Sequence, residues 1–232
     1  MRLDKTIASQ GTYSRKEVKE LLRKSRVTVN GTVVKDPGTN VNPEEVEIAI
    51  DGTLLSYQEH VYLMLNKPKG VVSATEDRSQ KTVLDLVPED LYRPGLFPAG
   101  RLDRDTTGFI LLTDDGDFAH RILSPKNHIR KTYVALLDHP LSPEDIAVLE
   151  EGVLLGDGTE CLPAEIELLG DTMVQISICE GKYHQIKRMF AARGNEVKEL
   201  MRTHMGALEL DPDLEEGQCR PLYLGEKEQI TN

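Results

Sequence analysis

The sequence contains no tryptophan, and aromatic residues make up only 5% of its 232 positions. With so few rings available, the core has to be built mainly from aliphatic side chains. The three cysteines (Cys161, Cys179 and Cys219) lie far apart and form no C-x-x-C pair. We therefore expect neither a disulfide framework nor a zinc site, which fits a reducing compartment.

Long apolar runs are also missing from the chain. No stretch approaches the roughly 20 apolar residues of a membrane span. The first residues, MRLDKTIASQG, lack the apolar segment of a signal peptide. We expect a cytoplasmic protein that does not associate with membranes. The six histidines show no H-E-x-x-H spacing, and no Walker or dinucleotide-binding glycine loop is present, so we expect no metal site.

Charge is unevenly distributed along the chain. The net charge of −11 argues against general adhesion to nucleic acid. Residues 1–35 nevertheless contain nine Lys or Arg against three acids, and residues 181–204 contain six against two. Residues 138–180 contain eleven acids and no Lys or Arg. An acidic protein thus contains two locally basic segments, which are candidates for contact with a polyanion.

The first sixty residues predict a helix, a second helix, a hairpin and a third strand. Ser14 and Glu17 form a capping box before the second helix. Asn30-Gly31 lies between alternating valines, which is typical of a two-residue hairpin. The segment 46–50 predicts the third strand, and residues 51–60 a linker.

This order, together with the S-R helix start and V-x-V-N-G, resembles the small RNA-binding domain named after ribosomal protein S-four. From charge alone, an ordinary α+β unit with a solvated basic helix is the alternative. The resemblance implies an RNA-binding surface formed by five basic residues: Arg2, Arg15, Lys16, Lys19 and Arg23.

The rest of the chain predicts an α+β fold with a mixed or antiparallel sheet. A strand is expected to begin near residue 61 and to end at Pro68. Further strands are expected over 109–113, 131–137, 173–179 and 221–225, and helices over 117–124, 142–152 and 183–194.

Asp103 lies in the segment GRLDRDTTGFILLT, on a loop that leads into an apolar strand. Arg101 and Arg104 flank it and favour the ionised carboxylate. An ionised carboxylate in a basic cleft can act as a nucleophile or a base. A turn with surface ion pairs is the alternative, and Asp103 with Asp105 could also suggest a two-carboxylate hydrolase.

Two later clusters contain candidate substrate contacts. Lys131 and Tyr133 lie at the start of a strand, where Tyr133 could stack on a base and Lys131 could contact phosphate. Ile186 belongs to the apolar face of the helix near 183–194, and Lys187 lies at the border of that face. Exposed cations without such roles are the alternative in both cases.

The three clusters occur in the order found in the pseudouridine synthases, which they resemble. GRLDRDTTG is similar to the catalytic motif of that family, KTYVA to its tyrosine motif, and EGKYHQIKRM to its third motif. With MLNKPKGVVS and the N-terminal domain, nearly the whole chain resembles the RsuA-type branch, which acts on the small ribosomal subunit.

The resemblance implies a role for each matching residue. Asp103 would attack the ribose or abstract its proton, Tyr133 would stack on the target uracil, and Lys187 would pair with Asp103. Ile186 would line the pocket, and Arg101 would fill the gap left by the flipped base. Arg104 and Lys131 are further candidate substrate contacts. No cofactor is implied.

These patterns predict an enzyme that isomerises a uridine in ribosomal RNA. The domains are expected at residues 1–56 (RNA binding) and 57–232 (pseudouridine synthase). We expect 16S RNA or a small-subunit assembly intermediate as the partner, and a monomer. A 23S-specific enzyme and a non-catalytic RNA-binding assembly factor are the alternatives.

Overall fold

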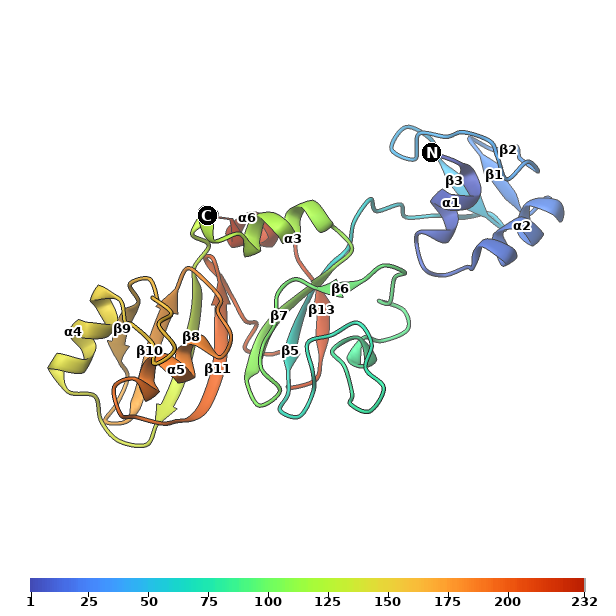
Figure 1. Cartoon of the computed structure of the whole chain (residues 1–232). Helices are drawn as coiled ribbons and strands as arrows, with labels where there is room; N and C mark the ends of the chain where they lie inside the picture. Colours follow the sequence, from blue (N-terminus) through green and yellow to red (C-terminus); the bar gives the residue numbers. More distant parts are fainter. Residues whose placement is uncertain (232) are drawn as a thin grey trace. The chain divides into compact units, whose positions relative to one another are not determined.

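The computed structural model describes residues 1–231, which form two compact units (Figure 1). The first unit comprises residues 1–61 together with residues 88–96. The second comprises residues 62–87 and the chain from residue 97 onward. Each unit therefore contains two separate stretches of sequence. The division at 56/57 remains a prediction about which parts fold independently.

Two helices and a small antiparallel sheet form the first unit. The helices are α1 (Leu3–Ala8) and α2 (Arg15–Arg23). The strand order is β2-β1-β3-β4, with β1 (Val27–Val29), β2 (Thr32–Val33), β3 (Ile48–Ile50) and β4 (Thr53–Leu54). Both bonds of the capping box are formed, by Ser14 and Glu17. Asn30 and Gly31 have φ of 48° and 75°, as the predicted hairpin turn requires.

The core of this unit is aliphatic, as predicted. The apolar faces of both helices pack on the sheet through Leu3, Ile7, Val18, Leu22 and Val27, all with 0% exposure.

Two features of this unit differ from the prediction. Residues 53–54, expected in a linker, form β4 and pair with β3. The segment 88–96 is tied to the N-terminal residues by Arg93, which is buried and donates from Nε to the carbonyl of Ser9 (2.6 Å) and from Nη2 to that of Gln58 (2.7 Å). Sequence pattern did not indicate this return of the chain.

A nine-stranded sheet forms the second unit. Its main path is β13-β5-β7-β11-β8-β10-β9, and β6 and β12 pair at its sides. The strands are β5 (Tyr62–Lys67), β6 (Phe97–Pro98), β7 (Thr107–Thr113), β8 (Lys131–Leu137), β9 (Glu165–Leu168), β10 (Met173–Ile178), β11 (Val197–Met205), β12 (Leu208–Glu209) and β13 (Cys219–Pro221). The β7–β11 pair is parallel and the other pairs are antiparallel, which confirms the predicted mixed sheet.

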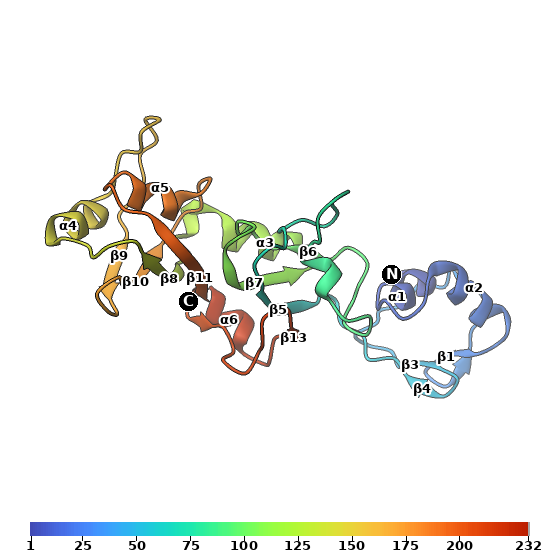
Figure 2. The same ribbon diagram turned by 90° about the horizontal axis from the view of Figure 1, so that it is seen from below.

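The helices of the second unit are α3 (Gly116–Leu123), α4 (Pro143–Glu151), α5 (Gln185–Ala191) and α6 (Glu226–Ile230), with short 3-10 turns at Leu84–Leu86 and Pro125–Asn127. Helices α3 and α6 share a core cluster with β5 and β7 that includes Phe118 and Ile230. Helix α4 lies beside β9 and α5 beside β11 (Figure 2). Among residues 1–231, no helix is long and apolar enough to cross a membrane.

Gly108 joins the two halves of the large sheet. Its φ is +95°, and a Cβ atom there would lie 2.2 Å from the carbonyl oxygen of Arg202 on β11. Glycine therefore allows β7 to bend next to its parallel partner.

The predicted strand over 221–225 is wrong beyond Pro221. Leu224 is fully exposed, so the apolar letters of that segment do not mark a buried strand.

Candidate active site

The loop of residues 100–106, called here the Asp103 loop, is fixed by buried side chains from the end of β5 and the segment that follows it. Ser73 Oγ donates to the carbonyl of Leu102 (2.9 Å) and accepts from its amide (3.0 Å). Lys67 Nζ donates to the carbonyls of Pro68 (3.1 Å), Arg104 (3.2 Å) and Thr106 (2.8 Å). Two buried side chains therefore hold the Asp103 loop: Ser73 binds its first half and Lys67 its second half.

Lys67 is a fully buried cation. Burial lowers its pKa to about 8, although Asp105 and Asp103 oppose this effect. An ammonium group in such a place needs several acceptors, and the three carbonyls provide them. Its position links the end of β5 to the backbone of the Asp103 loop.

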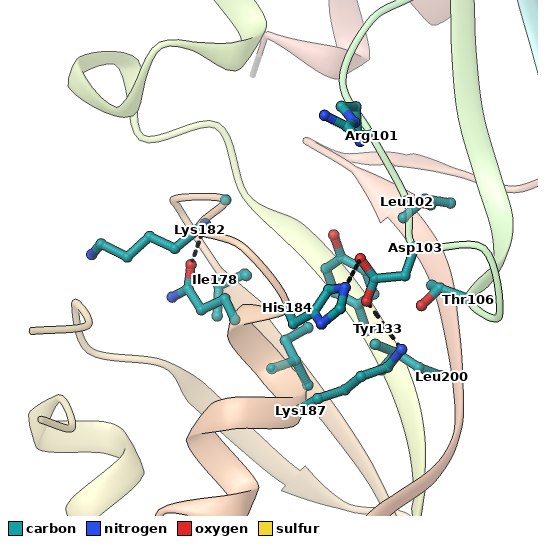
Figure 3. A pocket seen from close by; sticks show the side chains of 13 residues that line it. Arg101, Leu102, Asp103, Thr106, Tyr133, Ile178, Lys182, His184, Lys187 and Leu200 are labelled. Carbon is teal, nitrogen blue, oxygen red and sulfur yellow. Dashed lines mark hydrogen bonds and ion pairs between the residues drawn. The ribbon is translucent and has the colours of Figure 1, made fainter. Parts of the chain in front are cut away.

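Asp103 points toward the start of α5 (Figure 3). Its Oδ2 lies 3.0 Å from Lys187 Nζ, and its Oδ1 lies 3.5 Å from His184 Nε2. The Asp103 side chain is 25% exposed and that of Lys187 24%. The carboxylate thus keeps one open side toward solvent while two nitrogen atoms from another part of the chain face it.

Lys187 bridges two carboxylates. Its Nζ also contacts Asp105 Oδ1 at 2.6 Å. Burial opposes the charge on Lys187, but the hydrogen bonds to Asp105 and Asp103 outweigh it and raise its pKa. The bond from Lys187 likewise lowers the pKa of the Asp105 carboxyl. The Asp105 carboxylate and the Lys187 ammonium are therefore both kept charged at neutral pH.

Tyr133 and Ile186 form the buried wall of the same pocket. Tyr133 comes from β8 and is 7% exposed, and the Arg202 guanidinium lies 5.9 Å from the centre of its ring. Ile186 comes from α5 and is 4% exposed. The predicted residues that line this pocket are Arg101, Asp103, Tyr133, Ile186 and Lys187. Three segments that are distant in sequence therefore meet around one carboxylate.

Two parts of the chain match known protein families. Residues 61–192 match the family described as RNA pseudouridylate synthase, and residues 1–46 match the S4 domain. The chain belongs to the RNA pseudouridine synthase family. It is therefore an isomerase with an N-terminal S4 domain.

Relatives cover nearly all of this pseudouridine synthase. It is 48% identical to the RNA pseudouridine synthase YtzG of Bacillus subtilis, over 96% of this chain and 95% of that protein. It is 44% identical to the ribosomal small subunit pseudouridine synthase A of Escherichia coli, over 96% of each. A solved pseudouridylate synthase is similar with a TM-score of 0.70 and 43% identity, and the match covers 99% of each chain.

Lys131 is not placed for contact with substrate, contrary to the prediction. It is 5% exposed, and its Nζ donates to the carbonyl of Ile129 at 2.8 Å. Burial and the nearby charge of Arg202 lower its pKa to about 8. The side chain bends back into the fold, so backbone carbonyls near the entry to β8 accept its hydrogen bonds and it does not meet phosphate.

The arginines beside Asp103 also differ from the expectation. Arg104 is exposed, does not line the pocket, and donates weakly from Nε to the carbonyl of Gly70 at 3.4 Å. Arg101 lines the pocket on the side of Asp103 away from Lys187 (Figure 3). The side chains that contact the carboxylate are those of Lys187 and His184, not those of the two neighbouring arginines.

Several pocket residues were missed from the sequence. His184, Lys182 and Thr106 line the pocket, and Thr106 is 1% exposed. Asp105, considered above only for the two-carboxylate alternative, contacts Lys187. No local signal marks His184, because it precedes α5 with a left-handed backbone and the spacing rules of a helix do not apply to it.

The predicted RNA-binding residues of the S4 domain are all exposed. Arg15, Lys16, Lys19 and Arg23 lie on α2, away from the buried Val18 and Leu22. Arg23 pairs with Glu20, and Arg2 forms a two-bonded pair with Asp4. Arg15, Lys16 and Lys19 on α2 are therefore the more open candidates for phosphate contact.

Proposed function

We propose that this enzyme converts a uridine of ribosomal RNA, in the 16S molecule, to pseudouridine. The observation that carries the proposal is the Asp103 carboxylate, held 3.0 Å from Lys187 at the mouth of a pocket walled by Tyr133 and Ile186. The names of relatives that act on the small ribosomal subunit support the choice of RNA.

The reaction exchanges one bond to the ribose for another. The bond between C1′ and N1 of uracil breaks, the base turns, and a bond between C1′ and C5 forms. The hydrogen of C5 leaves as a proton, and N1 gains one. Asp103 reacts with the ribose, either as a nucleophile or as a base, and Lys187 stays paired with its carboxylate.

Tyr133 and Ile186 hold the detached base in this proposal. The target uridine has to leave its stack, which costs a few kcal/mol. Stacking on Tyr133 returns roughly 1–3 kcal/mol. Because the pocket wall is apolar, the uracil stays beside the ribose until it has turned. No cofactor takes part.

The partner is 16S RNA or a small-subunit assembly intermediate, bound by a cytoplasmic monomer. Relatives' names support the subunit, and the exposed cations of α2 supply a surface for phosphates. Sedimentation of the purified protein tests the oligomeric state. Comparing naked RNA with assembly particles as substrates tests which of them is modified.

Mapping of pseudouridine across both ribosomal RNAs in a deletion strain tests the function. Carbodiimide-dependent reverse-transcription stops should show one 16S uridine unmodified in the deletion strain. The wild-type gene should restore the stop, and Asp103→Asn should not. A missing site in 23S RNA would overturn the choice of subunit, and an unchanged map would overturn the proposal.

The Asp105→Asn variant separates this reaction from the hydrolase alternative. Asp105 is 72% exposed, so its pair with Lys187 is screened and contributes about 1 kcal/mol or less. We expect a loss of no more than about fivefold in the initial rate of pseudouridine formation. Abolished activity in Asp105→Asn would instead favour two cooperating carboxylates.

A further inference from the structure

Tyr183 is an exposed ring beside the pocket that the reaction described above does not use. At 75% exposure it is the most exposed of the seven tyrosines. Its ring stacks on that of His184, with centroids 3.8 Å apart and planes 20° from parallel. His184 itself lines the pocket and faces Asp103 (Figure 3). The stacked pair therefore runs from the pocket wall outward into solvent.

The backbone at His184 creates this arrangement. Consecutive side chains in an extended segment point to opposite sides, so neighbouring rings do not normally stack. His184 has φ of 47° and ψ of 37°, in the left-handed region that non-glycine residues rarely adopt. Arg188 then fixes the turn, because its amide binds the carbonyl of His184 (3.0 Å) and its Nη1 binds that of Tyr183 (3.3 Å).

We propose that the outer face of Tyr183 is a stacking site for a nucleobase next to the target uridine. The inference rests on the proposed function. When one base leaves a stack to enter a pocket, its neighbour loses a stacking partner. An aromatic side chain at the edge of the pocket replaces that partner, and unpaired bases are commonly bound in this way.

The surroundings of Tyr183 indicate stacking more than phosphate contact. Lys182 is already paired with Glu180, and Arg188 with Asp157 at 2.5 Å. Either cation would therefore have to give up its carboxylate partner before it could bind a phosphate. Substitution of Tyr183 should weaken RNA binding while leaving its dependence on salt concentration unchanged.

The test uses a short RNA that contains the uridine converted by the wild-type enzyme. We expect Tyr183→Ala to raise KM by about 5- to 100-fold, the effect of losing one base–aromatic stack. Tyr183→Phe keeps the ring and should stay within about twofold of wild type. Tyr223→Ala removes another exposed tyrosine of the same unit (62% exposed), and its KM should also stay within about twofold of wild type.

A set of RNAs that lack one base each separates stacking from support of His184. Removing the stacked base should weaken binding to the wild type but have little further effect in Tyr183→Ala. Equal penalties in both proteins, at every position flanking the target, would overturn the proposal, because Tyr183 would then act through His184 alone.

A binding measurement keeps this inference distinct from the proposed function. Fluorescence of 2-aminopurine placed beside the target is quenched when the base stacks on a ring. Quenching by the wild type but not by Tyr183→Ala would support the site even if no pseudouridine formed. Conversion of uridine with no difference in quenching would refute the site and leave the function intact.

Discussion

Lys187 links the candidate chemistry to the rest of the pocket, because it contacts both Asp103 and Asp105. Lys187→Met keeps the length of the side chain and removes its charge. We expect the rate of pseudouridine formation to fall by about 10- to 100-fold, which matches the roughly 1.5–3 kcal/mol of a hydrogen bond to a charged group.

The Lys187→Arg variant is the matched control for charge. It should lose less activity than Lys187→Met, since a guanidinium can still reach both carboxylates. Single-turnover rates at saturating RNA measure both variants. A methionine variant with wild-type rate would show that Asp103 does not depend on this pair.

Lys131 contributes to stability in a way that depends on pH. Its folded pKa is lowered from 10.5 to about 8. Between these values the unfolded chain binds the proton and the folded chain does not, so the free energy of unfolding rises with pH. Below about 8 both states are protonated, and the folded state keeps the full cost of a buried charge.

The Lys131→Met variant removes this titration. Relative to the variant, the wild type should gain up to about 1.4 kcal/mol per pH unit as pH rises above about 8. Urea unfolding of both proteins at several pH values measures the difference between their free energies of unfolding. The contributions of other groups that titrate in this range cancel in that difference. A constant difference would contradict the buried position. RNA affinity should be the same for both proteins.

At the level of elements, the joint between β7 and β11 depends on Gly108. Gly108→Ala would place a Cβ atom 2.2 Å from the carbonyl of Arg202 at φ of +95°. We expect a loss of at least about 2 kcal/mol in the free energy of unfolding, because neither backbone can move without breaking strand pairs.

The control for this variant is Gly116→Ala at the start of α3. There the space for a Cβ atom is open, and alanine favours the helix. Thermal unfolding of the two variants measures the contrast. If both variants had the same melting temperature, the close approach of the two strands would not be what requires glycine at position 108.

The predictable elements share a clear periodicity of apolar residues and clear capping or turn residues at their ends. Val27, Val29 and the Asn30-Gly31 turn defined the hairpin, and Ser14 with Glu17 defined the start of α2. Strand β11 was missed because VKELMRTHM mixes charged and apolar residues without alternation. Its central place comes from pairing with β8 and β7, which is set by contacts distant in sequence.

The residues of the site were predictable where a sequence motif contains them. They were not predictable where the backbone conformation determines the position of the side chain. Asp103, Tyr133 and Lys187 meet as expected. His184 reaches Asp103 only because its backbone is left-handed, which no local pattern indicates for histidine. Lys131 shares a strand with Tyr133, but nearby carbonyl groups capture its ammonium, and residue type alone cannot show that.

For the whole molecule, the contrast between net and local charge is the feature that matters for RNA. The chain has a net charge of −11, so long-range attraction to RNA is weak and binding has to come from local cations. Lys16 and Lys19 are both exposed on α2. If each meets a phosphate, each releases counterions when RNA binds.

Replacing Lys16 and Lys19 by glutamine should therefore change the dependence on salt. A plot of log affinity against log salt concentration should become shallower by roughly 1.4–1.8 for the two contacts together. The control, Glu150→Gln with Glu151→Gln, makes the net charge less negative on the exposed surface of α4 and should leave the slope unchanged. If instead the slopes followed net charge in both proteins, RNA would respond to the field of the whole molecule and α2 would hold no phosphate. The rate at saturating RNA should be equal in all three proteins, because neither pair of residues lies at the pocket.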